Sequence, residues 1–132
     1  MAKVLVVDDE PAVAMLMRFL LEKSGHSVVE ARNGLEALAA LGVRPDDASV
    51  ELPDVIVLDV MMPVMDGLDA AQAMRAHPRA SRVPILVVTA KGDMRTLFES
   101  MPQVVGFFQK PFDPRLLRDS VARAAASKIS EG

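Results

Sequence analysis

The stretch of sequence that decides the fold is DVIVLDVMMPVMDG, residues 54–67. Residues 55–58 are four consecutive apolar residues, three of them β-branched, and this pattern predicts a strand buried on both faces of a parallel sheet. Asp59 follows at once, so its carboxylate is expected at the carboxyl edge of the sheet, where open α/β folds bind ligands. Pro63 and the closing Asp-Gly pair indicate a turn before a helix. Taken alone, Asp59 is more often a helix cap than a nucleophile or a metal ligand.

The bulk properties are those of one small domain. A chain of 132 residues can bury about two-thirds of its unfolded surface, and no apolar run approaches the roughly 20 residues of a membrane span. The absence of cysteine excludes disulfides and thiolate metal sites. A net charge of -3 and the lack of Trp and Tyr argue against direct binding of nucleic acid. The start leads directly into a strand without a signal peptide, so we expect a cytoplasmic protein without membrane insertion.

Strand and helix patterns alternate along the chain. Apolar runs predict strands at residues 4–7, 27–31, 55–59, 83–88 and 104–108. Apolar residues at helical spacing predict helices at residues 11–25, 35–41, 67–77, 94–101 and 116–124, the fourth ended by Pro102. Such βαβ units predict an α/β fold, a doubly wound five-stranded parallel sheet with five helices. The long irregular segment 42–53 is expected to be a surface loop.

Polar side chains stand at the ends of four predicted strands. They are Asp8 and Asp9 after the first strand, Asp59 after the third, Thr89 after the fourth and Lys110 after the fifth. Because parallel strands point the same way, these groups should gather along one edge of the sheet. Three carboxylates crowded together repel one another unless a cation joins them, and ligands that are all oxygen select a hard ion. The sequence therefore predicts a Mg²⁺ site.

The same groups suit phosphoryl transfer, where catalysis is mostly positioning and charge neutralisation. Asp59 would be the nucleophile that forms an aspartyl-phosphate. Lys110 would supply a mobile positive charge, and Thr89 a hydroxyl donor to a phosphoryl oxygen. Each group has an ordinary structural explanation by itself, such as acids at a helix start. Their coincidence at successive strand ends favours the functional interpretation.

The chain resembles the receiver domains of bacterial two-component response regulators over nearly its whole length. The matching segments are residues 4–11, 57–67, 85–91 and 110–112. The resemblance, which extends to single-domain chemotaxis receivers, implies a flavodoxin-like sheet with strand order 2-1-3-4-5. It also implies a receiver domain at residues 1–127, followed by a short polar tail at residues 128–132.

The resemblance implies a role for each of the converging residues. Asp59 would accept a phosphoryl group from the phosphohistidine of a histidine kinase. Mg²⁺ would be held by Asp9, Asp59 and the backbone carbonyl of Met61, with Asp8 acting partly through water. Lys110 would contact the phosphoryl group, and its bond to the following proline would be cis.

The resemblance also implies a conformational switch. Thr89 would move to bind the phosphoryl oxygen, and Phe107 falls at the position of the family's switch aromatic. The inward swing of Phe107 would signal phosphorylation across the surface of the fourth helix, fifth strand and fifth helix. Two segments depart from the family: the 42–53 loop is long, and residues 100–106 replace a turn of small residues.

Two side chains near the site bear on how long the phosphoryl group lasts. Met61 should overhang the acyl phosphate, where an apolar side chain gives no proton and hinders an attacking water. Lys91 occupies the family's other position that tunes phosphate lifetime. We therefore expect slow self-dephosphorylation.

The expected partners are a histidine kinase or phosphotransfer protein and a downstream protein target. No DNA-binding domain follows in the sequence, so output should be protein contact or onward phosphotransfer. Met94, Phe98 and Met101 could expose a Met-rich contact patch, although most of that stripe is expected in the core. We expect no enzyme activity beyond the chain's own phosphorylation and dephosphorylation.

Three alternatives remain open at this point. The chain could be the receiver segment of a larger hybrid kinase or multidomain regulator. It could be a phosphatase resembling haloacid dehalogenases, but that chemistry requires a second aspartate where Met61 stands. A degenerate receiver that only binds partners would have lost one of its acids or Lys110, and none is lost.

Overall fold

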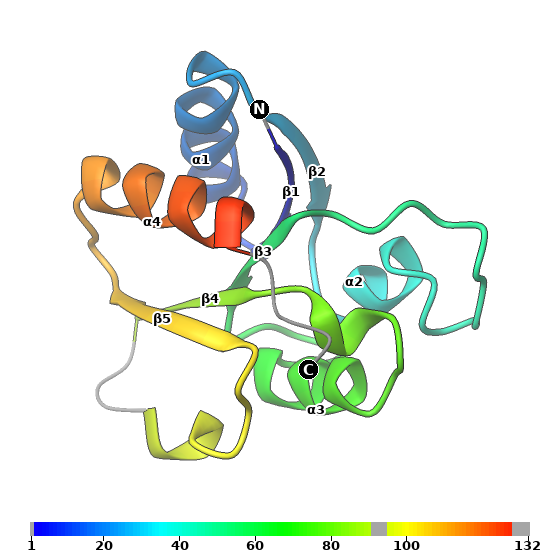
Figure 1. Cartoon of the computed structure of the whole chain (residues 1–132). Helices are drawn as coiled ribbons and strands as arrows, with labels where there is room; N and C mark the ends of the chain where they lie inside the picture. The colour runs from blue at the N-terminus through cyan, green and yellow to red at the C-terminus, as the bar shows by residue number, and fades with distance from the viewer. Residues whose placement is uncertain (1, 91–94, 128–132) are drawn as a thin grey trace.

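The computed structural model of the chain describes residues 2–90 and 95–127 (Figure 1). Here η denotes a 3-10 helix. The elements are β1 (Lys3–Val7), α1 (Pro11–Lys23), β2 (Ser27–Ala31), α2 (Gly34–Ala40), β3 (Val55–Asp59), α3 (Gly67–Arg75), η1 (Ala80–Arg82), β4 (Ile85–Thr89), η2 (Arg95–Phe98), β5 (Val104–Gln109) and α4 (Pro114–Ser127). The five predicted strands are confirmed, with ends within two residues of those expected. Among the described residues, no helix is long and apolar enough to span a bilayer.

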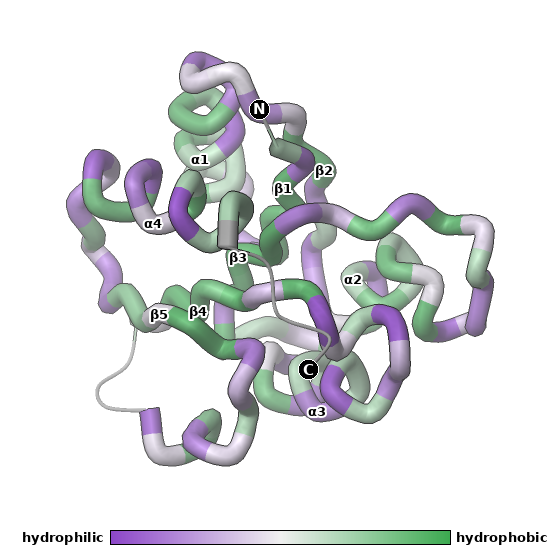
Figure 2. The backbone as a smooth tube through the Cα atoms, viewed as in Figure 1, coloured by the Kyte–Doolittle hydropathy of each residue, from purple (hydrophilic) through white to green (hydrophobic). Residues whose placement is uncertain are grey.

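The five strands form one parallel sheet in the order β2-β1-β3-β4-β5, as predicted. β3 and β4 are completely buried, which explains why both are continuous apolar runs. β2 lies at an edge of the sheet and is partly exposed, in agreement with its more polar sequence. Figure 2 shows hydrophobic residues concentrated along the inner strands.

The sheet separates two hydrophobic cores. Successive side chains of a strand point to opposite faces, so Ile56 and Leu58 enter one core while Val55 and Val57 enter the other. The first core is closed by α2 and α3, and the second by α1 and α4 (Figure 1). The layers are therefore those of a doubly wound α/β fold.

The helix starts follow their sequence signals. Pro11 is the first residue of α1, where its missing N–H is not needed. The Asn33 side chain accepts a hydrogen bond from the Glu36 backbone N–H at 2.8 Å and so caps α2. Asp66 caps α3 by accepting from the Asp69 N–H at 2.9 Å.

The segment predicted as the fourth helix is shorter in the structure. The described residues form four α-helices rather than five, and residues 95–98 make a single 3-10 turn. The turn continues into a hydrogen bond from the Met101 N–H to the Phe98 carbonyl at 3.0 Å, an i→i−3 bond. Pro102 explains the short turn, because it disfavours helical backbone at the residue before it. Phe98 and Met101 are buried in the first core, whereas Met94 lies outside the described residues.

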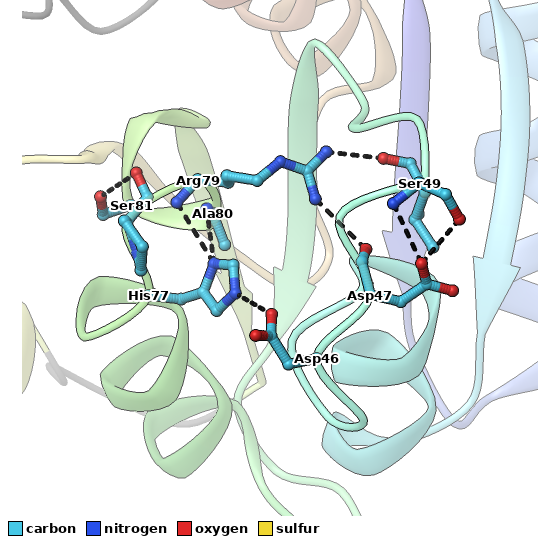
Figure 3. A network of polar contacts seen from close by, with 9 residues as sticks. Asp46, Asp47, Ser49, His77, Arg79, Ala80 and Ser81 are labelled. Atoms are coloured by element: carbon cyan, nitrogen blue, oxygen red, sulfur yellow. Dashed lines mark hydrogen bonds and ion pairs between the residues drawn. The ribbon is translucent and has the colours of Figure 1, made fainter.

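The long 42–53 loop packs against the connection between α3 and β4 (Figure 3). His77 Nε2 lies 2.8 Å from a carboxylate oxygen of Asp46. The Arg79 guanidinium donates to the backbone carbonyls of Asp47 at 3.3 Å and Val50 at 2.7 Å. This network lies at the amino edge of the sheet, because the loop leads into β3 and the connection leads into β4.

Gln103 also contacts the connection between α3 and β4. This buried residue lies one position before β5. Its side-chain amide donates to the backbone carbonyls of Ala80 at 3.1 Å and Val83 at 2.8 Å. The two segments that depart from the family, 42–53 and 100–106, therefore both contact the chain around η1.

Candidate functional site

The carboxyl edge of the sheet collects the polar residues that the sequence placed at strand ends. Asp8 follows β1, Asp59 and Thr89 are the last residues of β3 and β4, and Lys110 follows β5. Asp8, Asp59 and Thr89 are at most 5% exposed. The Lys110 backbone N–H donates to the Thr89 carbonyl at 2.8 Å, which fixes the start of the lysine loop against β4.

The turn after β3 holds Asp59 in place through a close backbone contact. A Cβ atom at Gly67 would lie 2.2 Å from the backbone oxygen of Asp59, so only glycine allows α3 to begin there. The Gly67 N–H also donates to the Val60 carbonyl at 2.8 Å. Within the same turn Val64 has a φ of 68°, a left-handed conformation that is strained for a β-branched residue.

Lys110 is the centre of the charge cluster. Its Nζ lies 2.7 Å from Glu10 Oε1, 3.0 Å from Asp8 Oδ2 and 3.6 Å from Asp59 Oδ2. The predicted meeting of Asp8, Asp59 and Lys110 is therefore found in the structure. The bond from Lys110 to Pro111 is cis, in agreement with the expectation.

The electrostatics of the cluster disfavour its negative charges. Burial, followed by the nearby charge of Asp8, raises the pKa of Asp59 to about 6, although Lys110 opposes this shift. Burial also raises the pKa of Asp8. For Lys110, burial lowers the pKa, but hydrogen bonds to Glu10 and Asp8 and the charge of Asp59 raise it above its usual range. Among the described residues, three carboxylates thus surround the Lys110 ammonium, which cannot neutralise all of them.

The donor set of the cluster fits a hard metal ion. Asp8, Glu10 and Asp59 each offer a carboxylate oxygen, and these oxygens lie within 4.8 Å of one another. Asp8 Oδ2 is fully buried, and its partner among the described residues is the Lys110 ammonium at 3.0 Å. Because Lys110 is shared with Glu10 and Asp59, a cation would add positive charge that this buried carboxylate lacks.

The three clustered carboxylates are not the three acids predicted as metal ligands. Glu10, which the sequence reasoning missed, belongs to it, and Asp9 does not. Asp9 remains close enough for its charge to contribute to the raised pKa of Asp59. It lines, together with Asp8, a groove of about 220 Å³ beside α1. The signal for Glu10 was present, because it is the third of three consecutive acids after β1.

The remaining predicted residues surround this cluster. The Met61 side chain is 51% exposed in the turn after β3. Phe107 is partly buried in β5, and its ring packs edge-on against Phe98 with centroids 5.9 Å apart. The Arg95 guanidinium carbon lies 5.6 Å from the centroid of the Phe107 ring. Lys91 lies outside the described residues.

Comparison with known proteins identifies the family. Residues 4–122 match the response regulator receiver domain, and the chain belongs to this family. The receiver domains of two-component and phosphorelay signalling are therefore its class. This membership decides against the phosphatase alternative.

The relatives that resemble the chain differ in length. It is 38% identical to the alkaline phosphatase synthesis transcriptional regulatory protein PhoP of Bacillus subtilis, over 96% of this chain and 53% of the relative. The chain thus spans about half the length of that relative. It is 33% identical to sporulation initiation phosphotransferase F of Bacillus subtilis, over 92% of this chain and 91% of the relative.

A solved structure carries the metal that the cluster suggests. It is the receiver domain of a sensor histidine kinase from Pseudomonas aeruginosa, with a magnesium ion coordinated in its active site cleft. The TM-score is 0.79 and the identity 27%, with 96% of this chain and 98% of that chain covered.

Proposed function

We propose that this chain is the phosphoacceptor module of a two-component system, with Asp59 as the residue that is phosphorylated. One observation carries the proposal: the buried Asp59 carboxylate lies 3.6 Å from Lys110 Nζ in a cluster short of positive charge. With a pKa of about 6, Asp59 is mostly ionised at neutral pH and is available as a nucleophile. The proposed receiver unit comprises residues 1–127, because α4 continues past the family match to Ser127.

The transfer step follows from these positions. An oxygen of the Asp59 carboxylate attacks the phosphorus of a phosphohistidine, so that a P–O bond forms while the P–N bond breaks. The electron pair of the P–N bond returns to the imidazole nitrogen of the donor. Lys110 neutralises charge on the phosphoryl oxygens, and the Thr89 hydroxyl donates a hydrogen bond to one of them.

Asp8, Asp9, Asp59 and the backbone carbonyl of Met61 would hold Mg²⁺, and Glu10 lies within the same cluster. When bound, the ion supplies positive charge to the carboxylates and to the phosphoryl oxygens. Asp8 would act partly through water. The raised pKa of Asp59 and the burial of Asp8 beside a lysine that it shares with two other carboxylates support this assignment.

The output of the site would pass through Thr89 and Phe107. Movement of Thr89 toward the phosphoryl group leaves space that the Phe107 ring enters. In the structure Phe107 contacts Phe98 of η2, so this swing would loosen η2 and alter the surface it forms. Phosphorylation would thereby change protein contacts.

The proposed partners are a histidine kinase or phosphotransfer protein upstream and a protein target downstream. Relatives that are phosphotransferases support onward phosphotransfer, and relatives twice as long support a role within a larger regulator. The location would be the cytoplasm, and direct contact with nucleic acid is not part of the proposal. The chain would catalyse only its own phosphorylation and dephosphorylation.

Incubation with acetyl phosphate and Mg²⁺ tests the proposal, with the mass of the intact protein as the readout. We expect one added phosphoryl group on the wild type and on the control Asp119→Asn, and none on Asp59→Asn. Asp119 is a suitable control because its side chain is 56% exposed on α4. Label on Asp59→Asn, or no Mg²⁺-dependent label on the wild type, would contradict the proposal.

A further inference from the structure

The Glu10 side chain contacts a residue that is far away in the sequence. It is the residue before α1, where short side chains such as Ser, Thr, Asp or Asn ordinarily cap the helix, and its side chain makes no capping hydrogen bond. Its carboxylate instead binds the Lys110 ammonium, 100 residues away in sequence, at 2.7 Å. Its backbone N–H donates to Asp8 Oδ1 at 2.9 Å, so the backbone of Glu10 is anchored to the same cluster.

The three carboxylates around Lys110 differ in depth. The side chains of Asp8 and Asp59 are 0% and 3% exposed, whereas that of Glu10 is 57% exposed. Glu10 also makes the shortest of the three contacts with the lysine. Lys110 therefore bridges two inner carboxylates and one outer carboxylate.

A divalent cation and the lysine compete for the inner carboxylates. A cation held by Asp8 and Asp59 repels the ammonium group at short range. The flexible lysine stem then allows the ammonium to remain on the outer carboxylate of Glu10. Under the proposed function, an incoming phosphoryl group would in turn draw Lys110 away from Glu10, since the same ammonium would contact both groups.

We propose that Glu10 is a positioning residue that holds Lys110 at the rim of the site while a cation occupies the inner carboxylates, and releases it to the phosphoryl group. The release of Lys110 to the phosphoryl group rests on the proposed function. The holding of Lys110 by Glu10 concerns cation binding and is independent of phosphorylation.

The proposal predicts opposite effects on two steps. Without the Glu10 charge, Lys110 falls back on Asp8 and Asp59 and competes better with the cation, so Mg²⁺ affinity decreases. At saturating Mg²⁺ the same substitution removes the competitor of the phosphoryl group, so phosphorylation by acetyl phosphate becomes faster. A purely structural role would not produce changes of opposite sign.

The test compares wild type, Glu10→Gln and Glu51→Gln. Glu51 is the matched control, since it pairs with Lys3 at 3.5 Å in an exposed position at the amino edge. Calorimetric titration with Mg²⁺ should show about threefold to tenfold weaker binding for Glu10→Gln only. The phosphorylation rate at saturating Mg²⁺ should rise about threefold for the same variant.

A double-mutant cycle with Lys110→Met shows whether Glu10 affects Mg²⁺ affinity by positioning Lys110 or directly through its own negative charge. In the Lys110→Met background, Glu10→Gln should change Mg²⁺ affinity by less than about twofold, because no lysine remains to be held. An equal loss in both backgrounds would make Glu10 a metal ligand or a plain charge and overturn the proposal. Unchanged Mg²⁺ affinity in Glu10→Gln would also overturn it.

The two proposals fail in distinguishable ways. If the wild type takes no phosphoryl group, the proposed function and the release of Lys110 are both wrong, while the calorimetric cycle still decides whether Glu10 holds Lys110. If the wild type is phosphorylated but Glu10→Gln is slower at saturating Mg²⁺, the release step alone is wrong.

Discussion

The two edges of the sheet handle polar groups in opposite ways. At the amino edge, Arg79 donates to backbone carbonyls and His77 contacts the exposed carboxylate of Asp46 (Figure 3). Gln103 donates to two further carbonyls there. At the carboxyl edge, the buried Asp8 and Asp59 share Lys110 with Glu10. At the amino edge, Arg79, Gln103 and His77 each contact a suitable acceptor, whereas the carboxyl edge concentrates like charges.

Under the proposed function, the amino edge stabilises the fold and the carboxyl edge carries out phosphoryl transfer. Hydrogen bonds to carbonyls satisfy groups that would otherwise be buried without partners. Crowded carboxylates instead cost stability until a cation or a proton arrives, and that cost favours ligand binding. We call the amino edge the stabilising edge, and the carboxyl edge, which carries the proposed phosphoacceptor, the reactive edge.

The largest effect is expected from Asp59→Asn at the reactive edge. In the folded protein the pKa of Asp59 is about 6, above its ordinary value of 3.8, so folding favours the protonated form. The stability that protonation contributes is present below about pH 4 and lost as the pH rises through about 6. In metal-free buffer at pH 8, Asp59→Asn should therefore raise the free energy of unfolding by on the order of 2–3 kcal/mol.

Urea unfolding at several pH values measures this gain. The difference between Asp59→Asn and wild type should shrink as the pH falls toward 4, whereas Asp119→Asn should show little change at any pH. Mg²⁺ at pH 8 should stabilise the wild type and reduce the gap. A gap that stays constant with pH would contradict the proposed burial cost of Asp59.

The second largest effect is expected from Gln103→Met at the stabilising edge. The substitution removes both hydrogen bonds to the carbonyls of Ala80 and Val83 and leaves those acceptors without their donor. The free energy of unfolding should fall by about 2 kcal/mol, equally at pH 5 and pH 8. The exposed Gln109→Met in β5 is the matched control.

We expect Gln103→Met to leave the phosphorylation rate unchanged, because the two edges of the sheet should act independently. A loss of phosphorylation without loss of stability would instead mean that the amino edge supports the site directly. Acetyl phosphate labelling of both glutamine variants measures this.

The smallest effect is expected from Met61 beside the reactive edge. Its half-exposed apolar side chain follows β3 and offers no proton to an attacking water. The wild-type phosphoprotein should therefore lose phosphate slowly, and Met61→Asn about threefold faster. Phosphate release from purified phosphoprotein measures both rates, with the exposed Met15→Asn of α1 as control. Loss from the wild type within seconds would show that Met61 does not protect the acyl phosphate.

Much of the fold could be predicted because its signals are local. Continuous β-branched runs such as residues 55–58 favour buried strands, and caps such as Asn33 mark helix starts. Parallel strands then bring residues at strand ends together without further information, which is why Asp8, Asp59 and Lys110 were found. The predicted fourth helix is a 3-10 turn over residues 95–98 in the described part of the chain, because Pro102 disfavours helical backbone at the residue before it.

The sequence alone determined the alternation of strands and helices, the strand order through its resemblance, and the edge that carries the acids. Only the tertiary structure decided that Glu10 rather than Asp9 joins the cluster around Lys110, and that the 42–53 loop packs on His77 and Arg79. These contacts join segments far apart in the chain through long side chains. Local backbone preference sets where such a side chain starts, but the partners that surround it in the folded protein set where it ends.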